Sequence, residues 1–90
     1  MLSNDKIISL IQNALYNTQF TLLSFDRNHQ VFGNMVVVIS DGQKSYQFVT
    51  DRGDISCNDK LLLDKGYHIA GQDDTPVYLS EEIGKIVHSK

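Results

Sequence analysis

The sequence predicts an α+β fold of two layers. An antiparallel meander sheet of three to five strands would carry an N-terminal and a C-terminal helix packed on one face. Apolar residues recur at helical spacing near both ends of the chain. Between them, apolar or alternating runs are separated by short polar turns, and strands joined in this way are antiparallel neighbours. The 90 residues are expected to form one domain, 1–90.

The first helix is expected over residues 4–16. Ser3 or Asn4 can cap its first turn by accepting a hydrogen bond from a backbone N–H. Asp5 lies in that turn, where a negative charge suits the helix dipole. The predicted apolar face comprises Ile7, Ile8, Ile11, Ala14 and Leu15.

Strands are expected next, separated by turn-forming residues. Gly33-Asn34 interrupts the second strand and suggests a bulge. Asp41-Gly42 is the clearest turn, because this dipeptide accepts the positive φ angles of a tight hairpin. A two-residue turn at that point would pair Ile39 with Lys44. The predicted strands are 20–25, 30–39, 43–50 and 55–57.

The C-terminal third is less uniform. Residues 60–65 fit a short helix capped by Asn58 or Asp59, or a strand built on 61–63. Residues 67–70 suggest another strand and 71–76 a loop. Ser80 would then cap a last helix at 81–88. Gly84 lies inside that helix at a cost of ~1 kcal/mol relative to alanine, which close packing against another element would explain.

Alternation in the central hairpin defines two faces of the sheet. The core face would hold Met35, Val37, Ile39, Tyr46 and Phe48. Val36 and Val38 point the other way. They are either strand formers covered by a loop such as 71–76, or part of a surface for a partner or for self-association. The interface candidates are Val36, Val38, Ser45, Gln47, Asp51 and Asp54.

Composition restricts the class of protein. The formal net charge is −3, with 8 Lys and Arg dispersed among 11 Asp and Glu, which argues against binding nucleic acid. One cysteine rules out a disulfide framework and favours a reducing compartment. No run approaches the ~18 apolar residues of a membrane span, and the N-terminus lacks a basic leader. A cytoplasmic protein that does not bind membranes is expected.

No motif supports catalysis, a cofactor or a metal. Cys57 could pair with His29 or His68 as a nucleophile, but a lone cysteine on a strand is usually a small buried apolar residue. Arg52-Gly53-Asp54 matches a cell-adhesion tripeptide, yet a turn between strands explains it more simply. Asp51 and Asp54 lack the spacing of a calcium loop.

The sequence therefore favours a small intracellular protein-binding or regulatory module without catalytic activity. A toxin-neutralising protein of the bacterial immunity type is one concrete form, and an acidic surface would suit a basic partner. An alternative is a small-molecule-binding domain with a pocket between helices and sheet. A third interpretation is a divergent enzyme using His68, Cys57 and an aspartate.

Overall fold

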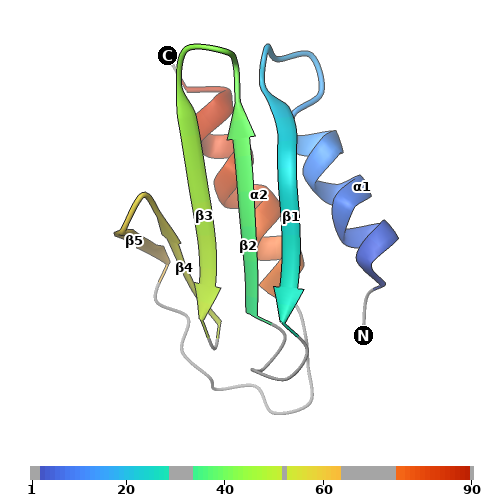
Figure 1. Ribbon diagram of the computed structural model, residues 1–90, viewed down its shortest axis with the longest axis vertical. Coiled ribbons are helices and arrows are strands. Elements are labelled where there is room, and N and C mark those ends of the chain that lie inside the picture. Colours follow the sequence, from blue (N-terminus) through green and yellow to red (C-terminus); the bar gives the residue numbers. More distant parts are fainter. Residues whose placement is uncertain (1–2, 29–33, 52, 64–74, 90) are drawn as a thin grey trace.

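The computed structural model describes residues 3–28, 34–51, 53–63 and 75–89. Along the chain, one helix precedes a five-stranded antiparallel sheet and a second helix follows it. The five strands lie in chain order, and both helices lie against one face of the sheet (Figure 1). The predicted two-layer α+β meander is confirmed. The elements are α1 Asn4–Ala14, β1 Thr21–Asn28, β2 Asn34–Ser40, β3 Ser45–Asp51, β4 Asp54–Cys57, β5 Lys60–Leu63 and α2 Thr75–Val87.

The core lies between the helices and the sheet. Four of the five predicted core side chains of the central hairpin are buried, and the fifth, Tyr46, is partly buried. The Tyr46 ring lies 5.7 Å from the ring of Phe20 and 6.5 Å from that of Phe48. Each fully buried aliphatic or aromatic side chain contributes about 1.5–3 kcal/mol. The buried apolar side chains are Ile7, Ile11, Leu15, Met35, Val37, Ile39, Phe48, Ile55, Cys57, Leu79 and Ile83.

The first helix begins as predicted and ends earlier. The Ser3 hydroxyl accepts a hydrogen bond from the Lys6 N–H at 3.3 Å, which confirms the N-cap. Ala14 is the last helical residue, so the predicted extension to residue 16 is wrong. The Thr18 hydroxyl stabilises the turn that follows. It donates to the Leu15 carbonyl at 2.6 Å and accepts from the Phe20 N–H at 3.2 Å.

The β2–β3 hairpin differs from the predicted register. Ile39 pairs with Tyr46 rather than Lys44, and the connecting loop spans 41–44 rather than two residues. The Asp41 carboxylate causes the difference, because its Oδ1 accepts from the Gln43 N–H at 2.8 Å and the Lys44 N–H at 2.7 Å. The register moves by two residues, and side chains alternate with a period of two. The predicted faces of both strands are therefore retained.

Residues 60–63 form a strand, so the helical interpretation of this segment is wrong. Asn58 and Asp59 have φ angles of 49° and 69°, and Cys57 pairs with Lys60 on either side of them. Two central residues with positive φ make the tight turn that suits twisted antiparallel strands. These two residues therefore connect β4 to β5 instead of capping a helix.

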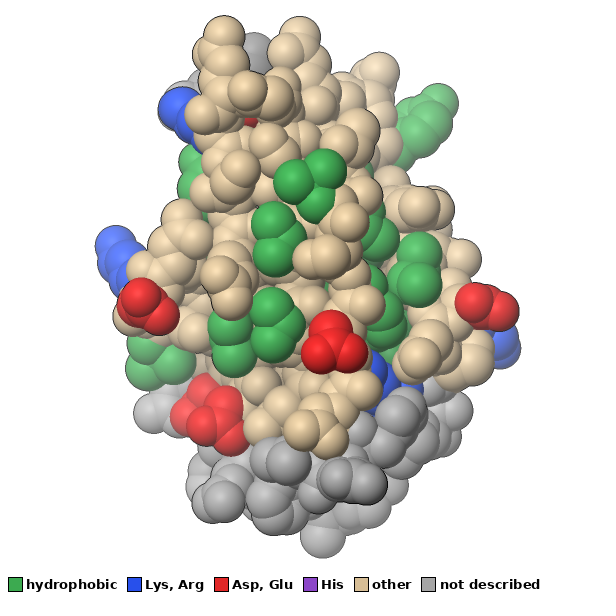
Figure 2. Space-filling model, viewed as in Figure 1, with side chains coloured by type: hydrophobic (Ala, Val, Ile, Leu, Met, Phe, Trp, Pro, Cys, Tyr) green, Lys and Arg blue, Asp and Glu red, His purple; other side chains and the backbone are tan. Residues whose placement is uncertain are grey.

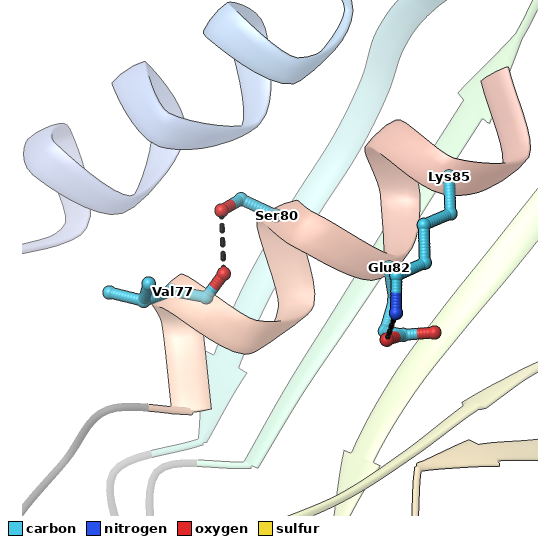
Figure 3. A network of polar contacts seen from close by, with 4 residues as sticks. All are labelled: Val77, Ser80, Glu82 and Lys85. Carbon is cyan, nitrogen blue, oxygen red and sulfur yellow. Dashed lines mark hydrogen bonds and ion pairs between the residues drawn. The ribbon is translucent and has the colours of Figure 1, made fainter. Parts of the chain in front are cut away.

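The last helix is longer than predicted. It begins at Thr75, and Pro76 lies in the first turn, where its missing N–H has no helical partner to lose. Pro76 and Leu79 are buried and extend the apolar stripe toward the N-terminus. Ser80 therefore lies inside α2, and the prediction that it caps the helix is wrong. Its hydroxyl donates to the Val77 carbonyl at 2.7 Å (Figure 3).

Gly84 has open space around it. A Cβ built on this residue would meet no atom within 4 Å beyond the helix itself. Close packing against another element therefore does not explain the glycine. The ammonium of the next residue, Lys85, contacts the Glu82 carboxylate at 2.9 Å (Figure 3).

Several predicted features lie outside the described residues. They are the bulge at Gly33, the strand at 67–70, and the side chains of His29, Arg52 and His68. Residues 71–74 of the predicted loop 71–76 also lie outside, and the prediction is wrong for its last two residues, which belong to α2.

Candidate protein interaction surface

The sheet face that α1 and α2 leave uncovered is the candidate functional surface, and we call it the open face. On β2, Val36 and Val38 are partly exposed between the buried Met35, Val37 and Ile39. The same alternation holds along β3. The described open-face residues of β2 and β3 are Asn34, Val36, Val38, Ser40, Ser45, Gln47, Val49 and Asp51.

One row of the open face crosses all five strands. Asp26 lies opposite Val36, and Val36 opposite Val49. Val49 lies opposite Ser56, and Ser56 opposite Leu61. The Leu61 side chain is 55% exposed. The middle of this face is thus apolar over neighbouring strands, with a carboxylate at one end of the row.

The adjoining row adds further apolar surface. Val38 lies between Ser24 on β1 and Gln47 on β3. The register of β1 shifts between Leu22 and Ser24, and the intervening Leu23 is 61% exposed. Figure 2 looks onto this face and shows hydrophobic side chains grouped over its middle. The valine strip is the name we use for Val36, Val38 and Val49.

Carboxylates border the valine strip, two of them at its end and one beside Val36. Asp51 lies opposite Asp54 where β3 turns into β4, and Asp26 lies one strand beyond β2. The Asp51 carboxylate accepts a hydrogen bond from the Asn34 amide at 3.3 Å. Acidic side chains border the hydrophobic group in Figure 2. We call Asp26, Asp51 and Asp54 the acidic end.

Two basic residues of the described strands, Arg27 and Lys60, lie on the helix side of the sheet. Arg27 follows Asp26 on β1, and its guanidinium donates to the Asn4 side chain of α1 at 3.4 Å, on the helix side. Lys60 lies opposite the buried Cys57, again on the helix side. Within the described strands, open-face positions hold three carboxylates and neither Lys nor Arg.

Hydroxyl groups occupy the opposite end of the open face. Thr21 lies opposite Ser40, and Ser40 opposite Ser45. The Thr21 hydroxyl donates to the Ser40 carbonyl at 3.4 Å. The face therefore changes along the strands from hydroxyls, through the valine strip, to carboxylates.

All six sequence-predicted interface residues lie on this face. Ser45, Gln47 and the two valines occupy its middle and its hydroxyl end, and Asp51 and Asp54 belong to the acidic end. Sequence reasoning missed Asp26 because the predicted strand ends at residue 25, whereas β1 continues to Asn28. It also missed Leu61, because the sequence does not decide between a helix and a strand for the segment that positions this side chain.

The described residues give no support to the nucleophile interpretation. Cys57 is buried, and burial raises the pKa of its thiol. The described histidine, His88, lies after α2, with its Nε2 3.1 Å from the Ala14 carbonyl. Within the described ranges, no three His, Cys, Asp or Glu side chains are placed to hold a metal ion.

Of the adhesion-type tripeptide, Gly53 lies between β3 and β4, and Asp54 is the first residue of β4. Asp51 pairs with Asp54 across the turn, and Gly53 has a φ of 93°, which a glycine adopts readily.

None of the described helices is long and apolar enough to cross a bilayer.

A cavity of about 340 Å³ opens at the end of the molecule opposite the acidic end. It exceeds the lower limit of ~300 Å³ for small-molecule sites. Its lining includes Phe20, Asp41, Val87 and His88.

Comparison of the chain with protein-family models, with curated protein sequences and with solved structures gives no significant match.

Proposed function

We propose that the chain is a small protein-binding or regulatory module, without catalytic activity, that binds a basic protein through its open face. The observation that supports this most strongly is the valine strip beside the acidic end. Open-face positions of the described strands hold three carboxylates and neither Lys nor Arg.

The two parts of the surface would serve different steps of binding. Removing the valine strip from water stabilises a complex by about 25 cal/mol per Å² of apolar surface. Carboxylates at the rim accelerate encounter with a basic surface and select against acidic ones. A partner of matching chemistry has an aliphatic patch flanked by Lys or Arg.

A toxin is one partner with this chemistry. Proteins that act on nucleic acid present Lys and Arg to phosphates, and an acidic surface can occupy the same groups. A toxin-neutralising protein of the bacterial immunity type would therefore use this face. Binding of a second copy through the valine strip is the competing outcome.

Site-specific photocrosslinking tests the proposal. A photoreactive phenylalanine analogue replaces Gln47 on the open face, and in a matched control it replaces Ser9, which is exposed on α1. In cells that produce the chain, position 47 should crosslink to a basic protein that position 9 does not reach. Crosslinking at position 9 alone, or only between copies of this chain, would contradict a basic partner on the open face.

The purified partner then allows a second measurement. Asp26→Asn removes one charge of the acidic end, and Glu81→Gln removes one from the exposed surface of α2. Asp26→Asn should weaken binding severalfold at low salt, and the difference should shrink as salt is raised. Glu81→Gln should leave the Kd unchanged. Equal effects of the two substitutions would mean that only net charge matters.

A further inference from the structure

The cavity of about 340 Å³ lies where four segments meet, away from the open-face acidic end. The C-terminal ends of both helices, the α1–β1 connection and the β2–β3 loop all come together at this end of the molecule (Figure 1). The bond between His88 and the Ala14 carbonyl, at 3.1 Å, joins the two helix ends beside it.

The cavity combines an apolar lining with a fixed negative charge. Phe20 and Val87 supply the apolar part, and the Phe20 ring packs on Tyr46 at 5.7 Å. Asp41 of the β2–β3 loop, whose carboxylate is exposed to solvent, supplies the charge at the edge of the cavity. The backbone N–H groups of Lys44 and Gln43 hold the pKa of its carboxyl below the usual range. This carboxylate is therefore ionised at neutral pH.

The helix ends add further negative potential. The C-terminus of a helix has a partial charge of about −0.5, which Lys or Arg in the last turn usually offsets. The last turn of α1 has no basic residue. Lys85 in the last turn of α2 is bound to Glu82 at 2.9 Å.

The hydroxyl groups of the cavity present acceptors. The Thr18 hydroxyl donates its proton to the Leu15 carbonyl at 2.6 Å, and the Ser89 hydroxyl donates to the Ile86 carbonyl at 2.9 Å. A hydroxyl has one proton and two lone pairs. The Thr18 oxygen already accepts from the Phe20 N–H at 3.2 Å, so it retains one lone pair, and the Ser89 oxygen also retains capacity to accept a hydrogen bond. A ligand at this site therefore meets a carboxylate and hydroxyl lone pairs.

We propose that this cavity binds a small organic cation, an ammonium group joined to a short apolar moiety. The ammonium donates hydrogen bonds to the Asp41 carboxylate and to the hydroxyl oxygens, and the apolar moiety packs on Phe20 and Val87. The site shares no residue with the valine strip or the acidic end. Its test is therefore independent of the proposed protein partner.

Lys44 weakens this site without lining it. Its ammonium belongs to the same loop as Asp41, and its charge contributes to the lowered pKa of the Asp41 carboxyl. Replacing it with a neutral side chain leaves the backbone N–H that binds Asp41 in place. Substitutions at Asp41 and Lys44 should therefore change cation affinity in opposite directions.

The test is a titration of the isotope-labelled protein with 2-phenylethylammonium, followed by two-dimensional amide NMR. Matched probes are 2-phenylethanol, which is neutral, and phenylacetate, which is an anion. The ammonium probe should shift the amide signals of Thr18, Phe20 and Ser89 in a saturable way. The alcohol should bind more weakly, and phenylacetate should leave these signals unmoved. Absence of saturable shifts with the ammonium probe would overturn the proposal.

Three variants separate charge from shape. Asp41→Asn keeps an Oδ1 acceptor for the loop and removes the charge, so the Kd for the ammonium probe should rise about fivefold. Lys44→Gln should lower it about twofold. Asp26→Asn makes the same charge change on the open face and should leave it unchanged. Equal binding by wild type and Asp41→Asn, or by ammonium and alcohol, would show that the site does not select cations.

Discussion

Asn58 extends the β-ladder of β3 with its own side chain. Its backbone N–H donates to the Gln47 carbonyl at 2.9 Å, and its side-chain Oδ1 accepts from the Gln47 N–H at 2.9 Å. Its amide Nδ2 also donates to the Ser45 carbonyl at 3.5 Å. The residue does this at a φ of 49°, which asparagine tolerates better than most side chains. The β4–β5 turn is thereby attached to the middle of the sheet.

Replacing Asn58 should separate the contribution of its side-chain hydrogen bonds from that of its tolerance of a positive φ angle. Asn58→Ala loses the side-chain hydrogen bonds and strains the positive φ, and should lower the free energy of unfolding by about 2 kcal/mol. Asn58→Gly loses only the hydrogen bonds and should cost about 1 kcal/mol. Urea denaturation measures both. If alanine and glycine were equally costly, the left-handed conformation would contribute nothing.

The sequence predicts the faces of the central hairpin better than its register. Which side chains share a face follows from alternation alone, so the buried positions of Val37 and Phe48 could be predicted. The pairing of Ile39 with Tyr46 depends on how the Asp41 carboxylate binds the loop, which a dipeptide pattern does not specify. The strand at 60–63 likewise depends on two adjacent non-glycine residues adopting positive φ.

Gly84→Ala should stabilise the protein. The residue lies inside α2, and the added methyl group would meet no neighbouring atom within 4 Å outside the helix. Alanine favours the helix by ~1 kcal/mol over glycine, which for a domain of this size raises Tm by about 4–8 °C. Thermal unfolding followed by circular dichroism measures the change. A lower Tm would mean that the site needs glycine for a reason other than space.

Thr50 supplies a buried acceptor to β2. Its side chain is 2% exposed, and its hydroxyl oxygen accepts from the Met35 N–H at 2.8 Å. Thr50→Val keeps the shape and leaves that N–H unpaired, which should cost about 1–3 kcal/mol of unfolding free energy. Thr50→Ser keeps the acceptor and loses one methyl group. Chemical denaturation should therefore show serine to be the milder substitution, and a milder valine would argue against the hydrogen bond.

Stability should fall at alkaline pH through Cys57. Burial raises the pKa of the folded thiol, whereas the unfolded thiol ionises near its ordinary value of about 8.5. The buried neutral thiol therefore contributes fully to the free energy of unfolding below about pH 8.5, and this contribution is lost as the pH rises through the pKa of the folded thiol. The difference between the denaturation midpoints of wild type and Cys57→Ala should therefore be smallest at high pH, where the wild-type protein has lost the contribution of the thiol. A difference that stays constant across this range would contradict the shifted thiol.

The open face could be predicted in its middle and not at its margins. Val36, Val38 and Gln47 follow from alternation in two strands. Asp26 joins them because β1 continues through residues that resemble a turn, and Leu61 because β5 pairs with β4. The cavity near Asp41 could not be predicted, since it requires segments distant in sequence to meet at one end of the two layers.

The most direct test of the open face measures how two matched substitutions change the affinity for the partner that crosslinking identifies. Val38→Thr introduces a hydroxyl into the valine strip, and Val77→Thr makes the same change on α2, where that valine is 39% exposed. Calorimetric titration should give a Kd about fivefold higher for Val38→Thr and unchanged for Val77→Thr. An unchanged Kd for Val38→Thr, or equal weakening by both, would show that the partner binds elsewhere.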